Sequence, residues 1–247
     1  MSILAVYSIK GGVGKTATSV NLAYLSSREQ LTLLLDMDPQ GAASYYFRVR
    51  AREKFNARKL LKGGHHIEHG IRGTDYPNLD ILPADFSYRN IDIELDECKK
   101  SHKRFQKILA PLTEEYGQLV LDCPPNLTLL SENVFYAADC ILVPVIPTTL
   151  SLLALEQLFT FLDEIGQSKD KVLPFFSMVE RRKKMHVDSM EVMRREVPVL
   201  DTVIPYAADV ERMGLFRQPV TAALPASPAS VAYRALWSEL RERLDCD

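Results

Sequence analysis

Short apolar runs alternate with amphipathic segments along most of the chain. Seven runs have the length and composition of buried strands, and they cover residues 3–7, 31–35, 79–84, 118–122, 140–145, 173–179 and 202–206. Four segments repeat apolar side chains at helical spacing, which predicts helices over residues 17–27, 92–111, 151–165 and 231–244. Residues 42–78 follow neither pattern regularly. We therefore expect an α/β protein whose strands are buried.

A glycine-rich turn stands between the first predicted strand and the first predicted helix. It reads Ile9-Lys10-Gly11-Gly12-Val13-Gly14-Lys15-Thr16. Glycines let backbone N–H groups close around phosphate oxygens, and the start of the next helix adds the positive end of its dipole. Lys15 is placed to reach β- and γ-phosphates, and the Thr16 hydroxyl to reach Mg²⁺. The alternative is a plain turn with two solvated lysines, but strand, turn and helix are the context that a phosphate-binding loop requires.

The turn departs from the general phosphate-loop pattern at two positions. Ile9 stands where that pattern has glycine, and Lys10 adds a second lysine before the glycine pair. The form K-G-G-x-G-K-[ST] resembles the deviant Walker A loop of the ParA/MinD/Soj ATPases, a group that includes the nitrogenase iron protein. By this resemblance the nucleotide contacts are Lys10, Gly11, Gly12, Val13, Gly14, Lys15, Thr16 and Ala17.

Two aspartate segments at the ends of predicted strands match the same group. Carboxylates at the carboxyl ends of parallel strands lie on the ligand side of an open sheet. Residues 36–41, D-M-D-P-Q-G, resemble switch I, which gives Asp38 the role of orienting or deprotonating the attacking water and places Asp36 nearer the metal. Residues 122–125, D-C-P-P, resemble a Walker B aspartate followed by switch II, so Asp122 would hold Mg²⁺ through a water molecule. Taken alone, either segment also fits a turn or a cap.

The three motifs in this order carry the resemblance across nearly the whole chain. It implies a single ATPase domain over residues 1–247, with a doubly wound, mainly parallel sheet flanked by helices. It also implies ATP and Mg²⁺ as ligands and hydrolysis by in-line attack of water on the γ-phosphate. In this family the first loop lysine crosses to the partner subunit of an ATP-bound homodimer, so the expected catalytic residues are Lys10, Lys15 and Asp38.

The last predicted strand, residues 202–206, is a candidate for the base-binding side of the site. In the resembling family this strand and the following loop line the adenine pocket. Pro205 and Tyr206 are therefore expected to contact the adenine. A packed strand end without a ligand contact is the alternative interpretation.

The function that the resemblance favours is that of a ParA-type partitioning or positioning ATPase. Its ATP dimer would bind non-specific DNA, and a ParB-like adaptor protein would stimulate hydrolysis, with the cargo left open between a plasmid, a chromosome and a protein complex. The expected DNA contacts are Arg181, Arg182, Lys183, Lys184, Arg212 and Arg217. Asp209 stands where the Soj subgroup carries a DNA-contacting arginine. The DNA surface is thus either shifted or replaced by a surface for another partner.

Composition agrees with an ordinary globular protein and limits the partners. The chain has 247 residues, of which 47% are hydrophobic, and a net charge of −2. A nucleic-acid site must therefore be a local basic patch. No apolar run approaches the length of a membrane span, the start lacks the basic region of a signal peptide, and the cysteines lack metal-type spacing. We expect a cytoplasmic, nucleoid-associated protein with reduced thiols.

Two other functions of the same superfamily fit the sequence less well. A MinD-like membrane-associated positioning ATPase needs a basic amphipathic tail, whereas this chain ends Leu244-Asp245-Cys246-Asp247. No stable membrane association is therefore expected. An iron–sulfur carrier needs paired cysteines at a dimer axis, and the cysteines here are scattered.

Two segments keep more than one interpretation. Residues 48–62 carry seven basic side chains and one acidic side chain, which fits a solvated face or a surface for a partner or DNA. Residues 63–70 contain His65, His66 and His69 in what we expect to be a glycine-bounded loop. A loop lacks the fixed ligand geometry of a helix face, which argues against a metal site.

Overall fold

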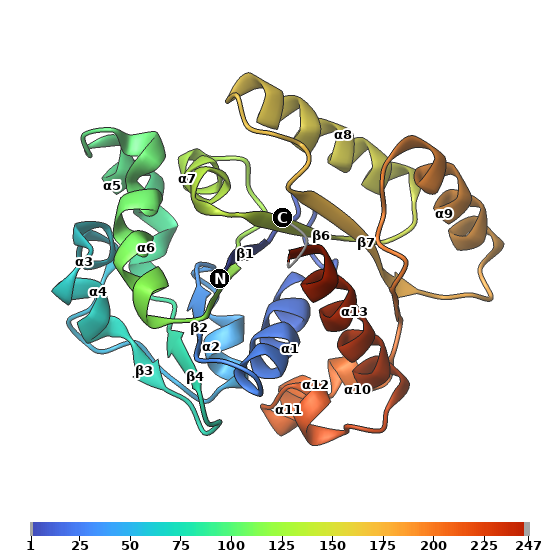
Figure 1. Cartoon of the computed structure of the whole chain (residues 1–247), viewed down its shortest axis with the longest axis horizontal. Coiled ribbons are helices and arrows are strands. Elements are labelled where there is room, and N and C mark those ends of the chain that lie inside the picture. The colour runs from blue at the N-terminus through green and yellow to red at the C-terminus, as the bar shows by residue number, and fades with distance from the viewer. Residues whose placement is uncertain (1, 245–247) are drawn as a thin grey trace.

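One eight-stranded sheet forms the centre of the computed structural model, which describes residues 2–244 (Figure 1). The strands lie in the order β3-β4-β2-β5-β1-β6-β7-β8, and every neighbouring pair is parallel except β3 and β4. This arrangement confirms the predicted mainly parallel α/β fold. The strands are β1 (Ser2–Val6), β2 (Thr32–Asp36), β3 (Arg72–Gly73), β4 (Leu79–Leu82), β5 (Gln118–Asp122), β6 (Cys140–Val145), β7 (Val172–Val179) and β8 (Val203–Pro205).

Helices cover both faces of the sheet. One face carries α1 (Lys15–Ser27), α2 (Ala42–Tyr46), α11 (Met213–Phe216), α12 (Val220–Ala223) and α13 (Pro228–Leu244). The other carries α3 (Ala57–Lys62), α4 (His65–Gly70), α5 (Ile91–Asp96), α6 (Arg104–Glu115), α7 (Leu129–Ala137), α8 (Thr149–Glu164) and α9 (Lys184–Glu196). Among residues 2–244, none of these helices combines the length and the apolar composition needed to cross a bilayer.

The central strands are apolar at consecutive positions because both of their faces are buried. In β1, Ile3 and Ala5 join the core under α5 to α8, whereas Leu4 and Val6 join the core under α1 and α13. Successive side chains of a strand point to opposite faces. Continuous apolar runs, rather than an alternating pattern, are therefore what this fold requires.

The strand order places a topological switch point beside β1. The chain first extends the sheet from β1 through β2 and β4 on one side, and after β5 it extends the other side through β6, β7 and β8. In open α/β sheets, ligands bind beyond the carboxyl ends of the strands at such a point. The glycine-rich turn follows β1 there, and Asp36 and Asp122 end β2 and β5.

The prediction of one helix over residues 92–111 was wrong. The 3₁₀ helix η1 (Phe86–Asn90) leads into α5, which ends at Asp96, and a further turn, η2 (Ser101–Lys103), precedes α6. The cause is a contact distant in sequence. The Asn133 side chain on α7 accepts the backbone N–H groups of Arg104 at 2.8 Å and Phe105 at 3.1 Å. These bonds start a new helix at Arg104.

Two smaller expectations also need correction. Residues 65–70 form α4 rather than a loop, because buried Ile67 anchors a helical turn that Gly63 and Gly64 introduce with positive φ. The histidines of this helix are exposed, and no group of three or more histidine, cysteine, aspartate or glutamate side chains among residues 2–244 is arranged to hold a metal ion. Val231, the first apolar residue of the helical pattern over residues 231–244, is 52% exposed rather than packed, because α13 packs through a face that includes Tyr233 and Leu236. The acidic residues 245–247 lie outside the described part of the chain.

Candidate functional site

A cavity of about 420 Å³ lies at the carboxyl ends of the central strands. This volume is in the range of small-molecule sites. Residues from the glycine-rich turn, the loops after β2 and β5, and the ends of β7 and β8 line it together. They include Gly11, Gly12, Gly14, Lys15, Thr16, Ala17, Asp38, Pro125, Ser177, Pro205 and Tyr206.

The turn between β1 and α1 depends on glycine at two positions. Gly12 and Gly14 have φ of +71° and +92°, which a residue with a Cβ rarely adopts. At Gly14 a Cβ would also lie 3.1 Å from the Ser177 hydroxyl oxygen. Gly14 is the N-cap of the thirteen-residue helix α1. The turn therefore brings the N-terminus of a full helix to the cavity, where its dipole favours an anion.

Lys15 is the buried cation of the site. Its side chain is 7% exposed, and Nζ donates to the Lys10 carbonyl at 3.3 Å. Burial lowers the pKa of Lys15, while the nearby charges of Asp122 and Asp38 oppose that change. An anion entering the cavity would meet this ammonium group at the end of the glycine turn.

Asp36 and Asp122 are fully buried and lie in register on neighbouring strands. Asp36 Oδ2 accepts the Ser44 N–H at 2.7 Å and the Ser44 hydroxyl at 2.6 Å, and Asp122 Oδ1 accepts the Ser19 hydroxyl at 2.9 Å. The other oxygen of each carboxylate has no hydrogen-bond partner among residues 2–244. Burial raises the pKa of both carboxylates, and for Asp122 the charge of Asp36 raises it further.

Two buried carboxylate oxygens without hydrogen-bond donors fit a hard divalent cation. Mg²⁺ prefers oxygen ligands and keeps several waters, and the cation would offset the repulsion between the two aspartates. The Thr16 hydroxyl lies close enough to Asp122 to lower its pKa. Thr16, Asp36 and Asp122, which the sequence suggested for Mg²⁺, are thus brought to the same end of the sheet.

Asp38 lies at the cavity in a tight turn. Its Oδ1 accepts the Gln40 N–H at 2.9 Å, and its carbonyl accepts the Gly41 N–H at 2.9 Å. Asparagine and aspartate often fix turns in this way. Asp38 is partly exposed, unlike buried Asp36. Its carboxylate is therefore accessible to a bound molecule or to water.

Pro205 and Tyr206, at the end of β8, also line the cavity. The Tyr206 N–H donates to the Val179 carbonyl at 3.0 Å, which continues the pairing of β7 with β8. The Tyr206 hydroxyl donates to Glu211 at 2.6 Å. The ring is 48% exposed, so this strand end presents a surface to the cavity rather than packing into the core.

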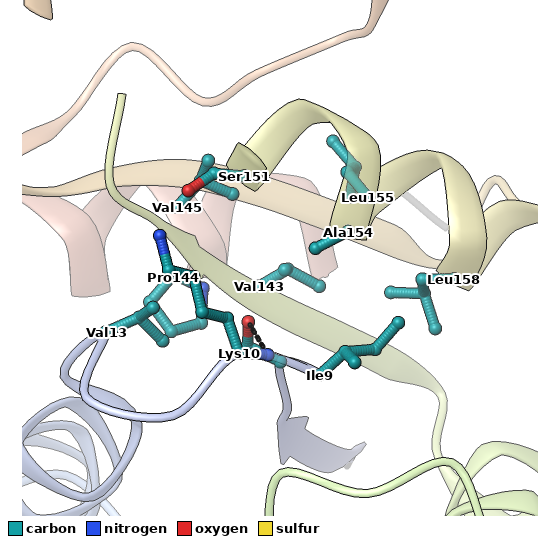
Figure 2. Close-up of a pocket in the computed structure, with 11 residues that line it drawn as sticks. Ile9, Lys10, Val13, Val143, Pro144, Val145, Ser151, Ala154, Leu155 and Leu158 are labelled. Carbon is teal, nitrogen blue, oxygen red and sulfur yellow. Dashed lines mark hydrogen bonds between the residues drawn. The ribbon is translucent and has the colours of Figure 1, made fainter. Parts of the chain in front are cut away.

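Lys10 occupies a different place from Lys15. It does not line the large cavity but a small hollow between the glycine turn, β6 and α8. Figure 2 shows its side chain running past Pro144 toward Ser151 at the start of α8. Val13 borders the same hollow and is buried. The loop thus presents one lysine to the cavity and one outside it.

Three serines complete the site and were missed in the sequence. Ser19 and Ser44 hold the buried carboxylates, and Ser177 lies against Gly14. Ser19 lies one helical turn after Lys15, where its hydroxyl also contacts the Lys15 carbonyl at 3.1 Å. The only feature of the sequence that could have indicated Ser19 is its position one helical turn after Lys15. Ser44 and Ser177 have no local sequence pattern that indicates their roles.

The candidate DNA contacts differ in whether they already pair with other side chains of this protein. Arg181, Arg182 and Lys184 are exposed and have no ionic partner among residues 2–244. Lys183 pairs with Glu180, and Arg212 lies 3.7 Å from Asp209.

Arg217 stacks on the Tyr45 ring at 4.5 Å and donates to the Tyr45 carbonyl at 3.2 Å. The basic residues of the β7–α9 connection are therefore the more available set.

Comparison with known proteins shows which sequences this chain resembles. A family model described as an AAA domain matches residues 1–175. A chromosome partitioning protein ParA from Myxococcus xanthus is 30% identical over 249 residues, which are 98% of this chain and 88% of that protein.

Two solved structures share the fold. A plasmid partition protein from Borrelia burgdorferi, bound to AMPPNP, has a TM-score of 0.87 at 22% identity, with 98% of this chain and 99% of that chain covered. A cobyrinic acid a,c-diamide synthase from Mycobacterium smegmatis, with bound ADP and magnesium, has a TM-score of 0.79 at 24% identity, with 99% and 95% covered.

Proposed function

We propose that this chain, which belongs to the ParA/MinD family of P-loop ATPases, is a ParA-type partitioning ATPase. It hydrolyses ATP as an ATP-bound homodimer. The observation that carries this proposal is the separate placement of the two loop lysines. Lys15 lines the cavity, whereas Lys10 lines a separate small hollow beside β6 and α8 (Figure 2).

Within one subunit, the chain supplies the groups that ATP and Mg²⁺ require. The N-terminus of α1 and Lys15 bind the phosphates. Thr16, Asp36 and Asp122 hold Mg²⁺, which offsets negative charge on the phosphates when bound. Pro205 and Tyr206 contact the adenine. Support comes from the cavity that Lys15, Thr16, Pro205 and Tyr206 line together, and from the two buried carboxylate oxygens without donors.

Asp38 is the residue that positions the attacking water. It is partly exposed at the cavity, and the turn to Gln40 fixes its carboxylate. Lys10 then supplies its charge to the nucleotide of the partner subunit. A cation provided in trans can accelerate phosphoryl transfer by ~10³–10⁵, so hydrolysis depends on the dimer.

Non-specific DNA and a ParB-like adaptor protein are the proposed partners, with a nucleoid-associated location in the cytoplasm. Arg181, Arg182 and Lys184 support DNA binding because they are exposed and free of ionic partners among the described residues. Such contacts go to phosphates and carry no sequence information.

Lys10→Ala tests the proposal. The variant should bind nucleotide as a monomer with nearly wild-type affinity, because Lys10 lies outside the cavity, but it should lose ATP-dependent dimerisation and hydrolysis. Nucleotide titration, size-exclusion chromatography and phosphate release measure the three properties. Lys99→Ala, a change at an exposed lysine that lines neither the cavity nor the hollow, is the control. Wild-type turnover by the Lys10 variant would refute the role in trans.

A further inference from the structure

A second cavity, of about 480 Å³, lies between α1, α12 and α13. Figure 1 shows α1 and α13 side by side. The start of α1 lines the cavity proposed for ATP, whereas Tyr24 and Leu25 near its end line this second one. Of residues 2–244, none lines both. The second cavity is therefore a separate site, and its volume is in the range of small-molecule sites.

Side-chain hydrogen bonds hold the three walls of this cavity together. Asn21 on α1 accepts the Thr221 N–H at 3.0 Å and the Thr221 hydroxyl at 2.8 Å, which fixes α12. Glu29, beyond the end of α1, pairs with Arg241 on α13 at 2.6 Å. Glu29 also accepts the Trp237 indole N–H at 3.3 Å. A site that is formed before binding loses less entropy when a ligand enters.

Arginines dominate the charge of the cavity wall. Three of them line it, Arg28, Arg234 and Arg241. Glu29 is the one lining carboxylate among residues 2–244, and it already pairs with Arg241. Arg28 and Arg234 have no carboxylate partner in that part of the chain. Arg234 Nη1 donates to the Pro225 carbonyl at 2.8 Å, which orients a guanidinium group whose other N–H groups can meet a ligand.

The remaining carboxylates of α13 do not cancel this charge. Glu239 and Glu242 do not line the cavity. Glu239 instead accepts the backbone N–H groups of Asp201 at 2.7 Å and Thr202 at 2.9 Å. Neither α12 nor the part of α1 after Lys15 contains a charged residue. The cavity is therefore positive, in a chain whose net charge is −2.

Aromatic side chains supply the apolar part of the wall. Tyr24 is partly exposed, and Trp237 is 5% exposed. Aromatic walls favour a flat ring, by offset stacking or by edge contact. Guanidinium groups favour phosphate, to which they can donate two parallel hydrogen bonds.

We propose that this second cavity binds a small aromatic phosphate monoester. Its phosphate pairs with Arg28 and Arg234, and its ring lies against Tyr24 and Trp237. A phosphate monoester carries a charge of about −1.5 to −2 at pH 7, which matches two arginines that no carboxylate pairs. A DNA duplex would use the arginines alone, because its bases are stacked inside the double helix and its backbone offers the aromatic wall no partner.

Trp237 gives this cavity its own signal, because it is the one tryptophan of the chain. The probe is phenyl phosphate, added to the full chain at constant ionic strength. Tryptophan fluorescence should change saturably, with a Kd of about 1 mM or below. Inorganic phosphate, which lacks the ring, and phenol, which lacks the charge, should each bind at least ~10-fold more weakly. ADP and Mg²⁺ should leave the Kd for phenyl phosphate unchanged, since the two cavities are separate.

Two variants test the phosphate contacts one at a time. Arg28→Gln and Arg234→Gln each remove a cation at an exposed position. Each should weaken phenyl phosphate binding at least ~10-fold, because a charged hydrogen bond is lost. The matched control is Arg195→Gln, at an exposed arginine of α9 on the opposite face of the sheet, and it should leave the Kd unchanged.

Several outcomes would overturn the proposal, and none of them depends on ATP hydrolysis. Phenyl phosphate might give no saturable change up to about 10 mM, or bind all variants equally. ADP and Mg²⁺ could abolish the signal, which would place the phosphate in the other cavity. Inorganic phosphate that binds as tightly as phenyl phosphate would remove the ring from the site. A DNA duplex that displaces phenyl phosphate and needs both arginines would assign them to DNA instead.

Discussion

Asp36 and Asp122 end neighbouring strands in register, and each keeps one buried oxygen without a hydrogen-bond partner among residues 2–244. Burial raises the pKa of both carboxyl groups, and the charge of Asp36 raises the pKa of Asp122 further. The folded protein therefore binds the protons of these two carboxyl groups more tightly than the unfolded chain does. Stability that is present near the ordinary aspartate pKa, about 3.9, is lost as the pH rises toward the raised values.

Replacing Asp122 by asparagine should remove part of this pH dependence. The asparagine side chain keeps an oxygen that can accept from Ser19 but does not ionise. Without metal, the free energy of unfolding of Asp122→Asn relative to wild type should increase on the order of 1 kcal/mol between about pH 5 and about pH 8. Denaturant unfolding in EDTA measures the difference. Adding Mg²⁺ at the higher pH should stabilise wild type more than the variant. An unchanged difference across pH would contradict the raised pKa.

Ser44 links Asp36 to the neighbouring strand end. Its hydroxyl donates to Asp36 at 2.6 Å and accepts the Ala84 N–H at 3.0 Å. Ser44→Ala should lower stability by about 1.5–3 kcal/mol, because a hydrogen bond to a buried charge is removed. Chemical denaturation measures this decrease, and phosphate release should fall as Asp36 loses its fixed position. Ser238→Ala, at an exposed position on α13, should change neither property. Wild-type stability of Ser44→Ala would show that Asp36 does not depend on this hydroxyl.

The sequence predicted the parts of the site that local backbone determines. A turn that needs φ above zero shows itself as glycine, as at Gly14, and a carboxylate that ends a buried strand is placed by the strand, as at Asp122. The motif order then indicated the family.

What the sequence did not predict depends on contacts between distant segments. Ser19 meets Asp122 across 103 positions, and Asn133 starts α6 from α7. The residues next to Ser19 and Asn133 in the sequence do not indicate which distant group each side chain contacts. The division of the helix expected over 92–111 follows from such a contact, because propensity alone would continue it.

Asp38→Ala should separate binding from hydrolysis. The Asp38 side chain holds a turn at the cavity but makes no contact with buried Asp36 that an alanine would break in the metal site. The variant should bind ATP and Mg²⁺, accumulate as a dimer and release phosphate slowly. Size-exclusion chromatography beside a phosphate assay measures both. A variant that stays monomeric, or that hydrolyses at the normal rate, would remove Asp38 from the water-positioning role.

The availability of Arg182 distinguishes it from the other candidate DNA contacts. Arg182 is exposed after β7 and has no ionic partner among residues 2–244, whereas Arg212 lies 3.7 Å from Asp209. An arginine already paired with a carboxylate gains less from a phosphate. Replacing Arg182 should therefore weaken DNA binding more than replacing Arg212.

Arg182→Glu should weaken binding to every duplex alike and leave the ATP dimer intact, because phosphate contacts carry no sequence information. Removing one arginine–phosphate pair should reduce the log–log salt slope by about 0.9. Anisotropy on two unrelated duplexes, at several salt concentrations and with ATP or ADP, measures affinity, slope and nucleotide dependence. Affinity should be higher with ATP, since only the dimer presents two such patches together. Strong preference for one duplex, or equal affinity with both nucleotides, would favour a protein rather than DNA as the partner of this surface.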